Sequence, residues 1–252
     1  MDNTEKIASE LKVEFMPIYS ELLKKVASVK LEKCIFFPQW GANYPFSKEH
    51  CGIMVMGRAC NGWHSISQNI DILFGTSDES IFNRKDQMRW VENSAGNKDG
   101  YNTNRSAFWR VTKRIVQCFY PNEWSSYIAW SNVCKVAPWK GGNPNNTLYY
   151  AQLESCQKIF KAEIRLFSPK VVVMFTNNSW AADLLKYMNN NQEPICLEQL
   201  NWDKYKCYVY RINETYFVVS EHPQGKKEEI HAESIISFIK SIQNLQGINR
   251  CC

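Results

Sequence analysis

Short, uninterrupted apolar runs alternate along this chain with longer stretches in which apolar residues recur at helical spacing. The runs are 52–57 (GIMVMG), 127–133 (YIAWSNV) and 170–175 (KVVVMF). A run without a polar side is typical of a strand covered on both faces, as in a parallel sheet. The helical patterns occupy 4–28, 105–118, 147–167, 178–189 and 227–245. Their alternation with the runs predicts an α/β fold, a three-layer α/β/α sandwich with a mainly parallel central sheet.

A β-hairpin is expected near the end of the chain. Residues 206–212 (KCYVYRI) and 215–220 (TYFVVS) flank Asn213 and Glu214, a spacing typical of two strands joined by a tight turn. The second strand should end close to His222.

The length of 252 residues is enough for one domain with a substantial core. We therefore expect a single domain over 1–252, with an N-terminal helical extension over about 1–30. The polar stretches 76–104 and 136–146 are expected to form long loops at the ends of strands.

Composition narrows the function only slightly. The net charge of +5 is a mild preference for polyanions, and a solvated surface explains it equally well. The ten cysteines include no C-x-x-C pair, several lie within apolar runs, and the charged start of the chain does not resemble a signal peptide. We expect reduced, buried thiols in a cytoplasmic protein. No stretch approaches the length of a membrane span, so no membrane partner is expected.

Unusual residues follow three of the expected strands. They are the segments 57–63 (GRACNGW), 131–144 (SNVCKVAPWKGGNP) and 221–226 (EHPQGK). In open α/β sheets the working site lies at the carboxyl ends of the parallel strands. The three segments should therefore meet at one edge of the sheet, with His222 in the site.

Taken together, these segments resemble the uracil-DNA glycosylase superfamily. That family has a glycine-bearing loop after its first strand, an N-V-x-K loop after the second and an H-P-S loop after the last. In addition, 106–115 (SAFWRVTKRI) is similar to a helix of the mismatch-specific uracil/thymine branch, and 155–175 is similar to the helix-then-strand segment common in the family. The resemblance covers about residues 50–245 in consistent order, which makes it more specific than any single motif.

The resemblance implies a DNA-repair hydrolase that cleaves the N-glycosidic bond of a damaged or deaminated base such as uracil. Its substrate base would be flipped out of the duplex into a pocket, where the last-loop histidine would stabilise the oxyanion of the departing base. The catalytic roles fall to His222 and Asn61. The substrate-binding roles fall to Gly57, Arg58, Ala59, Trp63, Phe108, Asn132, Pro223 and Gln224. The expected DNA contacts are Lys135, Lys140, Gly225 and Lys226.

The first loop departs from the family pattern. Ala59 stands where many branches have Asp or Asn, Arg58 stands where the iron–sulfur branch has Glu, and no carboxylate occupies the loop. Arg58 could instead bind a phosphate or a base edge. Whether the protein is an enzyme therefore stays open. The alternative is a catalytically inactive module of the same fold that binds nucleic acid, a nucleobase or a protein partner.

Other candidates have plain structural interpretations. Asn61 can shape a turn with Gly62, because Asn-Gly is a turn signal. Asn132 can bond its own loop, whereas Trp139, between Pro138 and Lys140, could face a nucleic acid.

No metal or other cofactor is expected. The iron–sulfur branch needs a cysteine directly after the second-loop lysine and a close N-terminal cysteine pair. Here Val136 follows Lys135, and no close pair precedes it.

Overall fold

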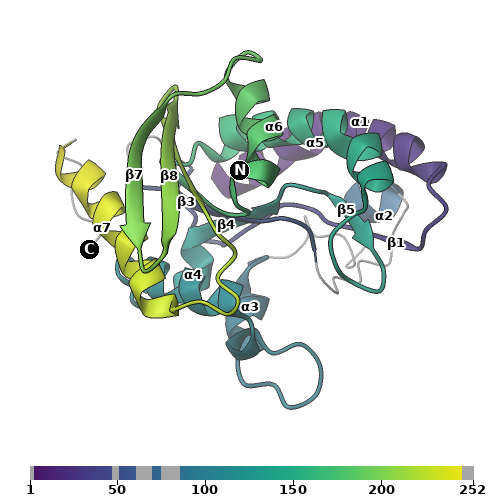
Figure 1. The fold of residues 1–252 in the computed structure, drawn as a ribbon. Coiled ribbons are helices and arrows are strands. Elements are labelled where there is room, and N and C mark those ends of the chain that lie inside the picture. The colour runs from purple at the N-terminus through teal and green to yellow at the C-terminus, as the bar shows by residue number, and fades with distance from the viewer. Residues whose placement is uncertain (1–2, 47–50, 61–69, 75–85, 246–252) are drawn as a thin grey trace.

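A mixed seven-strand sheet flanked by helices is the centre of the computed structural model, which describes residues 3–46, 51–60, 70–74 and 86–245 (Figure 1). In sheet order its strands are β2 (Gln39–Trp40), β4 (Ile128–Asn132), β3 (Ile53–Gly57), β6 (Val171–Phe175), β9 (Thr215–Ser220), β8 (Tyr205–Ile212) and β7 (Cys196–Trp202). The strands β1 (Lys33–Ile35) and β5 (Val136–Pro138) form a separate antiparallel pair. The α-helices of the described chain are α1 (Asn3–Ala27), α2 (Ile70–Phe74), α3 (Arg89–Asn93), α4 (Ala107–Gln117), α5 (Asn146–Phe167), α6 (Asn178–Met188) and α7 (Glu228–Leu245). Two 3-10 turns, η2 (Thr103–Arg105) and η3 (Trp124–Tyr127), lie beside α4.

The sheet is parallel only in its middle. The strands β4, β3, β6 and β9 run in parallel, whereas β2, β8 and β7 are antiparallel to their neighbours. The α/β prediction is therefore confirmed, and the expectation of a mainly parallel sheet holds for the four central strands. Tight turns at Asp203 and Asn213, both with positive φ, join β7 to β8 and β8 to β9. Connections this short can only join antiparallel strands.

Helices cover both faces of the sheet, which explains the continuous apolar runs. Along β3, Met54 and Met56 lie in the core shared with α1, α5 and α6, while Ile53 and Val55 lie in the core shared with α4 and α7. Figure 1 shows the two groups of helices on opposite sides of the strands. Successive residues of a strand point to opposite faces. Both sides of each central strand must therefore be apolar.

Helix α1 is packed into the core. Its residues Leu11, Phe15 and Tyr19 are fully buried, and the helix lies along α5. Phe15 also contacts Phe37 edge-on, with ring centroids 5.5 Å apart. The N-terminal segment expected as an extension thus supplies one wall of the hydrophobic core.

The longer elements follow the sequence expectations closely, and the short ones do not. The five expected helices correspond to α1, α4, α5, α6 and α7. The stretch 136–146 was expected to be a loop, yet it begins with β5, which forms by pairing with the distant strand β1. A segment this short has no periodicity of its own from which to predict it. No helix in the described part of the chain combines the length and apolarity that a membrane crossing requires.

Candidate functional site

The ends of β3 and β4 are bonded directly to each other. Gly57 lies opposite Asn132 in the parallel register. Beyond the strands, Val133 N donates to Gly57 O and Cys134 N to Arg58 O, each at 2.9 Å. A Cβ on Gly57 would stand 2.6 Å from Asn132 Oδ1. Only glycine leaves room for the Asn132 side chain to lie this close to the end of β3.

Phe108 closes one side of this junction from the start of α4. Its ring reaches within 3.7 Å of the position that a Gly57 Cβ would take, and it packs edge-on against Phe175 at the end of β6, with centroids 5.4 Å apart. The side chain is 8% exposed. The structure therefore brings Gly57, Phe108 and Asn132 together, and their substrate-binding roles stay a prediction.

Asn132 carries a buried donor that the described residues leave unused. Its side chain is 2% exposed, and its Nδ2 has no hydrogen-bond partner within the described ranges. Leaving such a group unpaired costs roughly 1–3 kcal/mol. Nδ2 is itself buried, so an acceptor oxygen from outside could bond to it only after neighbouring side chains moved aside.

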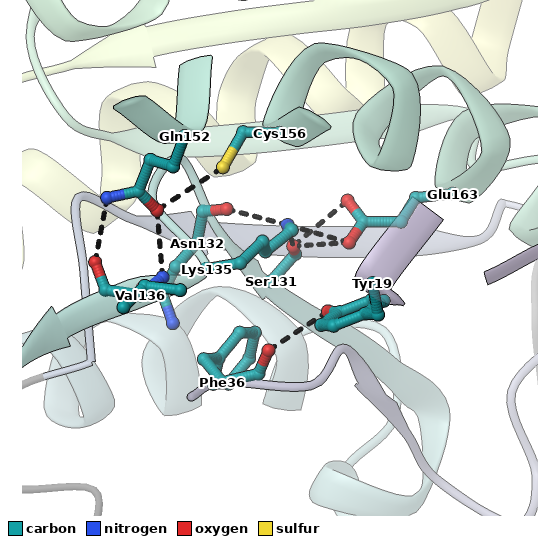
Figure 2. Close-up of polar contacts among 9 residues, drawn as sticks. All are labelled: Tyr19, Phe36, Ser131, Asn132, Lys135, Val136, Gln152, Cys156 and Glu163. Atoms are coloured by element: carbon teal, nitrogen blue, oxygen red, sulfur yellow. Dashed lines mark hydrogen bonds and ion pairs between the residues drawn. The ribbon is translucent and has the colours of Figure 1, made fainter. Parts of the chain in front are cut away.

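A buried ion pair holds the backbone of Asn132 in place (Figure 2). Lys135 Nζ donates to Ser131 Oγ at 2.5 Å and to Asn132 O at 2.7 Å, and it lies 2.7 Å from Glu163 Oε1 on α5. Ser131 Oγ donates in turn to the Glu163 carboxylate at 2.9 Å. All three hydrogens of the ammonium group have an acceptor, so the 131–135 turn is wrapped around the lysine.

The position of Lys135 corrects the sequence prediction of a DNA contact. Both side chains of the Lys135–Glu163 pair are 0% exposed, and no phosphate could reach the ammonium group without opening the fold. Burial raises the pKa of Glu163, although the neighbouring Lys135 opposes that shift. The sequence showed a lysine next to a candidate loop. It did not show that a glutamate of α5 would hold that lysine inside.

His222 is held as a neutral imidazole with a defined tautomer. Gln224 N donates to His222 Nδ1 at 3.2 Å, so in the neutral ring the proton sits on Nε2. Burial lowers the pKa of His222, and the positive charges of Arg58 and Lys226 lower it further. The imidazole follows β9, which lies two strands from β3 in the sheet. Nε2–H is then a donor that no described residue engages.

Arg58 links the first loop to the end of β6. Its Nε donates to Thr176 O at 2.9 Å. In the amide orientation that satisfies its neighbours, Asn177 Oδ1 accepts from Arg58 Nη2 at 3.1 Å. The guanidinium carbon lies 5.9 Å from the centre of the Trp180 ring. The end of β6 is thus a further side of the site, and the sequence analysis did not include it.

The last loop is braced by its own lysine. Lys226 Nζ donates to His222 O at 2.8 Å and lies 5.0 Å from the centre of the Tyr205 ring. Pro223 is buried, whereas Gln224 and Gly225 are exposed. The loop therefore presents both a cation and two outward-facing residues.

Some of the remaining candidate residues are described by the structure, and others lie outside the described residues. Ala59 is half-buried and packs against the core, and Lys140 is exposed. The predicted catalytic residue Asn61 and the predicted stacking residue Trp63 lie outside the described residues. Trp139, which was expected to face a nucleic acid, is half-buried and packs against the core.

A buried polar cluster supports the last loop from below, and sequence reasoning missed it. His231 Nε2 lies 2.6 Å from Ser220 Oγ, its ring stacks on Trp202 with centroids 3.8 Å apart, and Cys207 Sγ donates to Ser220 Oγ at 3.0 Å. Burial lowers the pKa of His231 to about 3. A signal was present, because His231 lies one helical turn before Ile235 on the apolar face of α7.

Comparison with known proteins adds no family assignment. No protein-family model matches the chain, and no curated protein matches it. Within the described ranges, no three His, Cys, Asp or Glu side chains are grouped so as to hold a metal ion. The site must therefore be interpreted from its own geometry.

Proposed function

We propose that the chain is a DNA-base glycosylase-like protein on a three-layer α/β/α fold of the uracil-DNA glycosylase type. One observation carries the proposal. The loops after β3, β4 and β9, which the resemblance had joined, follow parallel strands of one sheet, and Asn132 at the end of β4 and His222 in the last loop carry side-chain donors that no described residue engages. In this proposal the substrate is a base flipped out of DNA, and a cytoplasmic location stays a prediction from the sequence.

The donors suit a base with carbonyl oxygens. Asn132 Nδ2 would donate to one oxygen of the base edge, and the Phe108 ring would pack beside the heterocycle. His222 Nε2–H would donate to an oxygen on which negative charge develops as the glycosidic bond breaks. A neutral imidazole can fill this role, because in this tautomer its Nε2 still carries a hydrogen that it can donate.

A release assay tests the enzymatic proposal. Purified protein should liberate free base from duplexes carrying uracil, hypoxanthine or a thymine mismatch, and His222→Ala should lower the rate by at least tenfold. Lys12→Ala, on α1, is the matched control and should leave the rate unchanged. Release that is absent from all three duplexes would remove the enzymatic part of the proposal.

The composition of the first loop favours a second candidate function. Positions 57–60 hold Gly57, Arg58, Ala59 and Cys60, so no carboxylate in that part of the loop could activate a water molecule. A non-catalytic module would bind the same DNA and release no base. Binding of a uracil duplex that is retained without any base release would favour this candidate.

A further inference from the structure

Arg58 lies at the point where the chain connections of the sheet diverge. From β3 the chain passes to β4 on one side and then to β6 on the other side. In open α/β sheets a crevice forms outside the carboxyl ends of two such strands, and ligands bind there. Arg58 follows β3, while Thr176 and Asn177 follow β6, so the arginine stands at the carboxyl ends of these two strands.

The guanidinium group of Arg58 is anchored but not neutralised. Thr176 O and Asn177 Oδ1 occupy two of its five N–H donors. No carboxylate among the described residues forms an ion pair with it. The side chain is partly exposed. A planar guanidinium group of this kind, held in place and with N–H donors still free, can bind an oxyanion through two parallel hydrogen bonds.

The last loop, which carries further donors, is connected to the end of β6 on which Arg58 is anchored. Asn177 N donates to Ser220 O at 2.8 Å, which joins the end of β6 to the end of β9. Two residues further on is His222, whose carbonyl holds the ammonium group of Lys226 at 2.8 Å. Glu221, the carboxylate of this segment, makes no ion pair with Arg58 or Lys226 among the described contacts. The electrostatic effect of both cations on the pKa of His222 agrees with this proximity.

We propose that Arg58, assisted by Lys226, binds a phosphate group, so that the site accepts a nucleotide or a nucleic-acid strand and not a free base or nucleoside. An anion at the guanidinium group would offset the positive field that Arg58 and Lys226 create, whereas a neutral base edge would offset none of it. The assignment of the ligand as a nucleotide rests on the proposed function. The phosphate subsite itself rests on the contacts of Arg58.

The subsite is tested by following the His222 ring with nuclear magnetic resonance while inorganic phosphate is added. Bound phosphate should raise the pKa of His222, because a neighbouring anion favours the imidazolium. Arg58→Gln should weaken phosphate binding by at least tenfold, and Arg58→Lys by less, since lysine keeps the charge and loses the planar guanidinium group. The matched control is Arg114→Gln, an exposed arginine on α4, which should change the affinity by less than twofold.

A second titration compares deoxyuridine with deoxyuridine monophosphate. The monophosphate should bind at least tenfold more tightly to the wild type and lose that advantage in Arg58→Gln. Equal phosphate affinity of the wild type and Arg58→Gln overturns the proposal, as does equal binding of nucleoside and nucleotide. Circular dichroism confirms that each variant is folded. The two proposals can fail independently. If no base is ever released but Arg58→Gln still weakens phosphate binding by at least tenfold, the glycosylase function fails and the phosphate subsite stands.

Discussion

At the scale of single residues, His231 shows how burial fixes a protonation state. The ring is fully buried between Trp202 and Phe175 and bonded to Ser220. Burial is the largest cause of its low pKa, and the charges of Lys226 and His222 lower the pKa further. A neutral His231 therefore helps to keep the end of β9 in place below the last loop.

The pKa of His231 predicts a loss of stability in acid. In the unfolded chain the imidazole takes up a proton near pH 6.5, whereas in the fold it does so only at about 3. The unfolded state then binds more protons between these values, so the free energy of unfolding falls as the pH is lowered from 6.5 toward 3. At pH 4.5 the loss from this group should be about 2–3 kcal/mol.

Urea unfolding of the wild type and His231→Gln at pH 7 and pH 4.5 measures this effect. Glutamine cannot take up a proton, so the difference in unfolding free energy between the two proteins should shrink in acid. Because every other titrating group is present in both proteins, their contributions cancel. An unchanged difference at the two pH values would contradict the prediction.

The close approach of Gly57 to Asn132 gives a second prediction at the residue scale. A methyl group at position 57 would collide with Asn132 Oδ1 at 2.6 Å, so Gly57→Ala should lower the free energy of unfolding by about 1–3 kcal/mol. It should also displace the amide of Asn132 and weaken binding of a uracil-containing strand. Denaturant unfolding and a binding titration measure the two effects. A variant with wild-type stability would show that the strand ends are more loosely joined than described.

At the scale of elements, the Lys135–Glu163 pair joins the end of β4 to α5 through the interior. Two charges that are both fully buried must keep each other paired, because the desolvation of either one alone is costly. Lys135 of this pair also fixes the backbone carbonyl of Asn132. We therefore assign Lys135 a structural role in positioning the second loop.

Removing one partner of the Lys135–Glu163 pair should destabilise the fold, because the other charge would be left buried and unpaired. Lys135→Met should lower the free energy of unfolding by about 3–5 kcal/mol, whereas the double variant Lys135→Met with Glu163→Met should lose much less, because no charge stays buried alone. The matched control is Lys186→Met in the exposed pair with Glu193, which should cost no more than about 1 kcal/mol. Urea unfolding of the wild type and the three variants measures these differences in unfolding free energy. A single variant no worse than the control would refute the buried pairing.

At the scale of the whole molecule, α1 completes one face of the sheet. Phe15 on this helix is fully buried, whereas Val13 on the opposite side is 74% exposed. Phe15→Ala should therefore lower the free energy of unfolding by about 3–5 kcal/mol, and Val13→Ala should change it by less than about 0.5 kcal/mol. Thermal or urea unfolding distinguishes the two. Similar small effects at both positions would mean that the helix is the appendage that its sequence position suggested.

The α/β architecture follows from local patterns. The runs that became β3, β4 and β6 lack a polar side, and the long helices repeat their apolar residues once per turn, so each of these elements is determined by its own segment. The antiparallel outer strands are partly local as well, since the turn at Asn213 imposes the direction of β9 relative to β8. The strands β1, β2 and β5 are too short to carry such a pattern.

In the candidate site, too, some features follow from local sequence and others depend on the tertiary structure. The sequence by itself determined that Gly57, Asn132 and His222 each lie at or just after the end of a strand, because a strand end is visible in a single segment. Only the tertiary structure decided which polar groups face outward. It buried Lys135 against Glu163, anchored Arg58 on Thr176 and Asn177, and enclosed His231 behind Trp202. The physical reason is that the cost of burying a charge depends on partners from distant segments, and no local pattern records where those partners will lie.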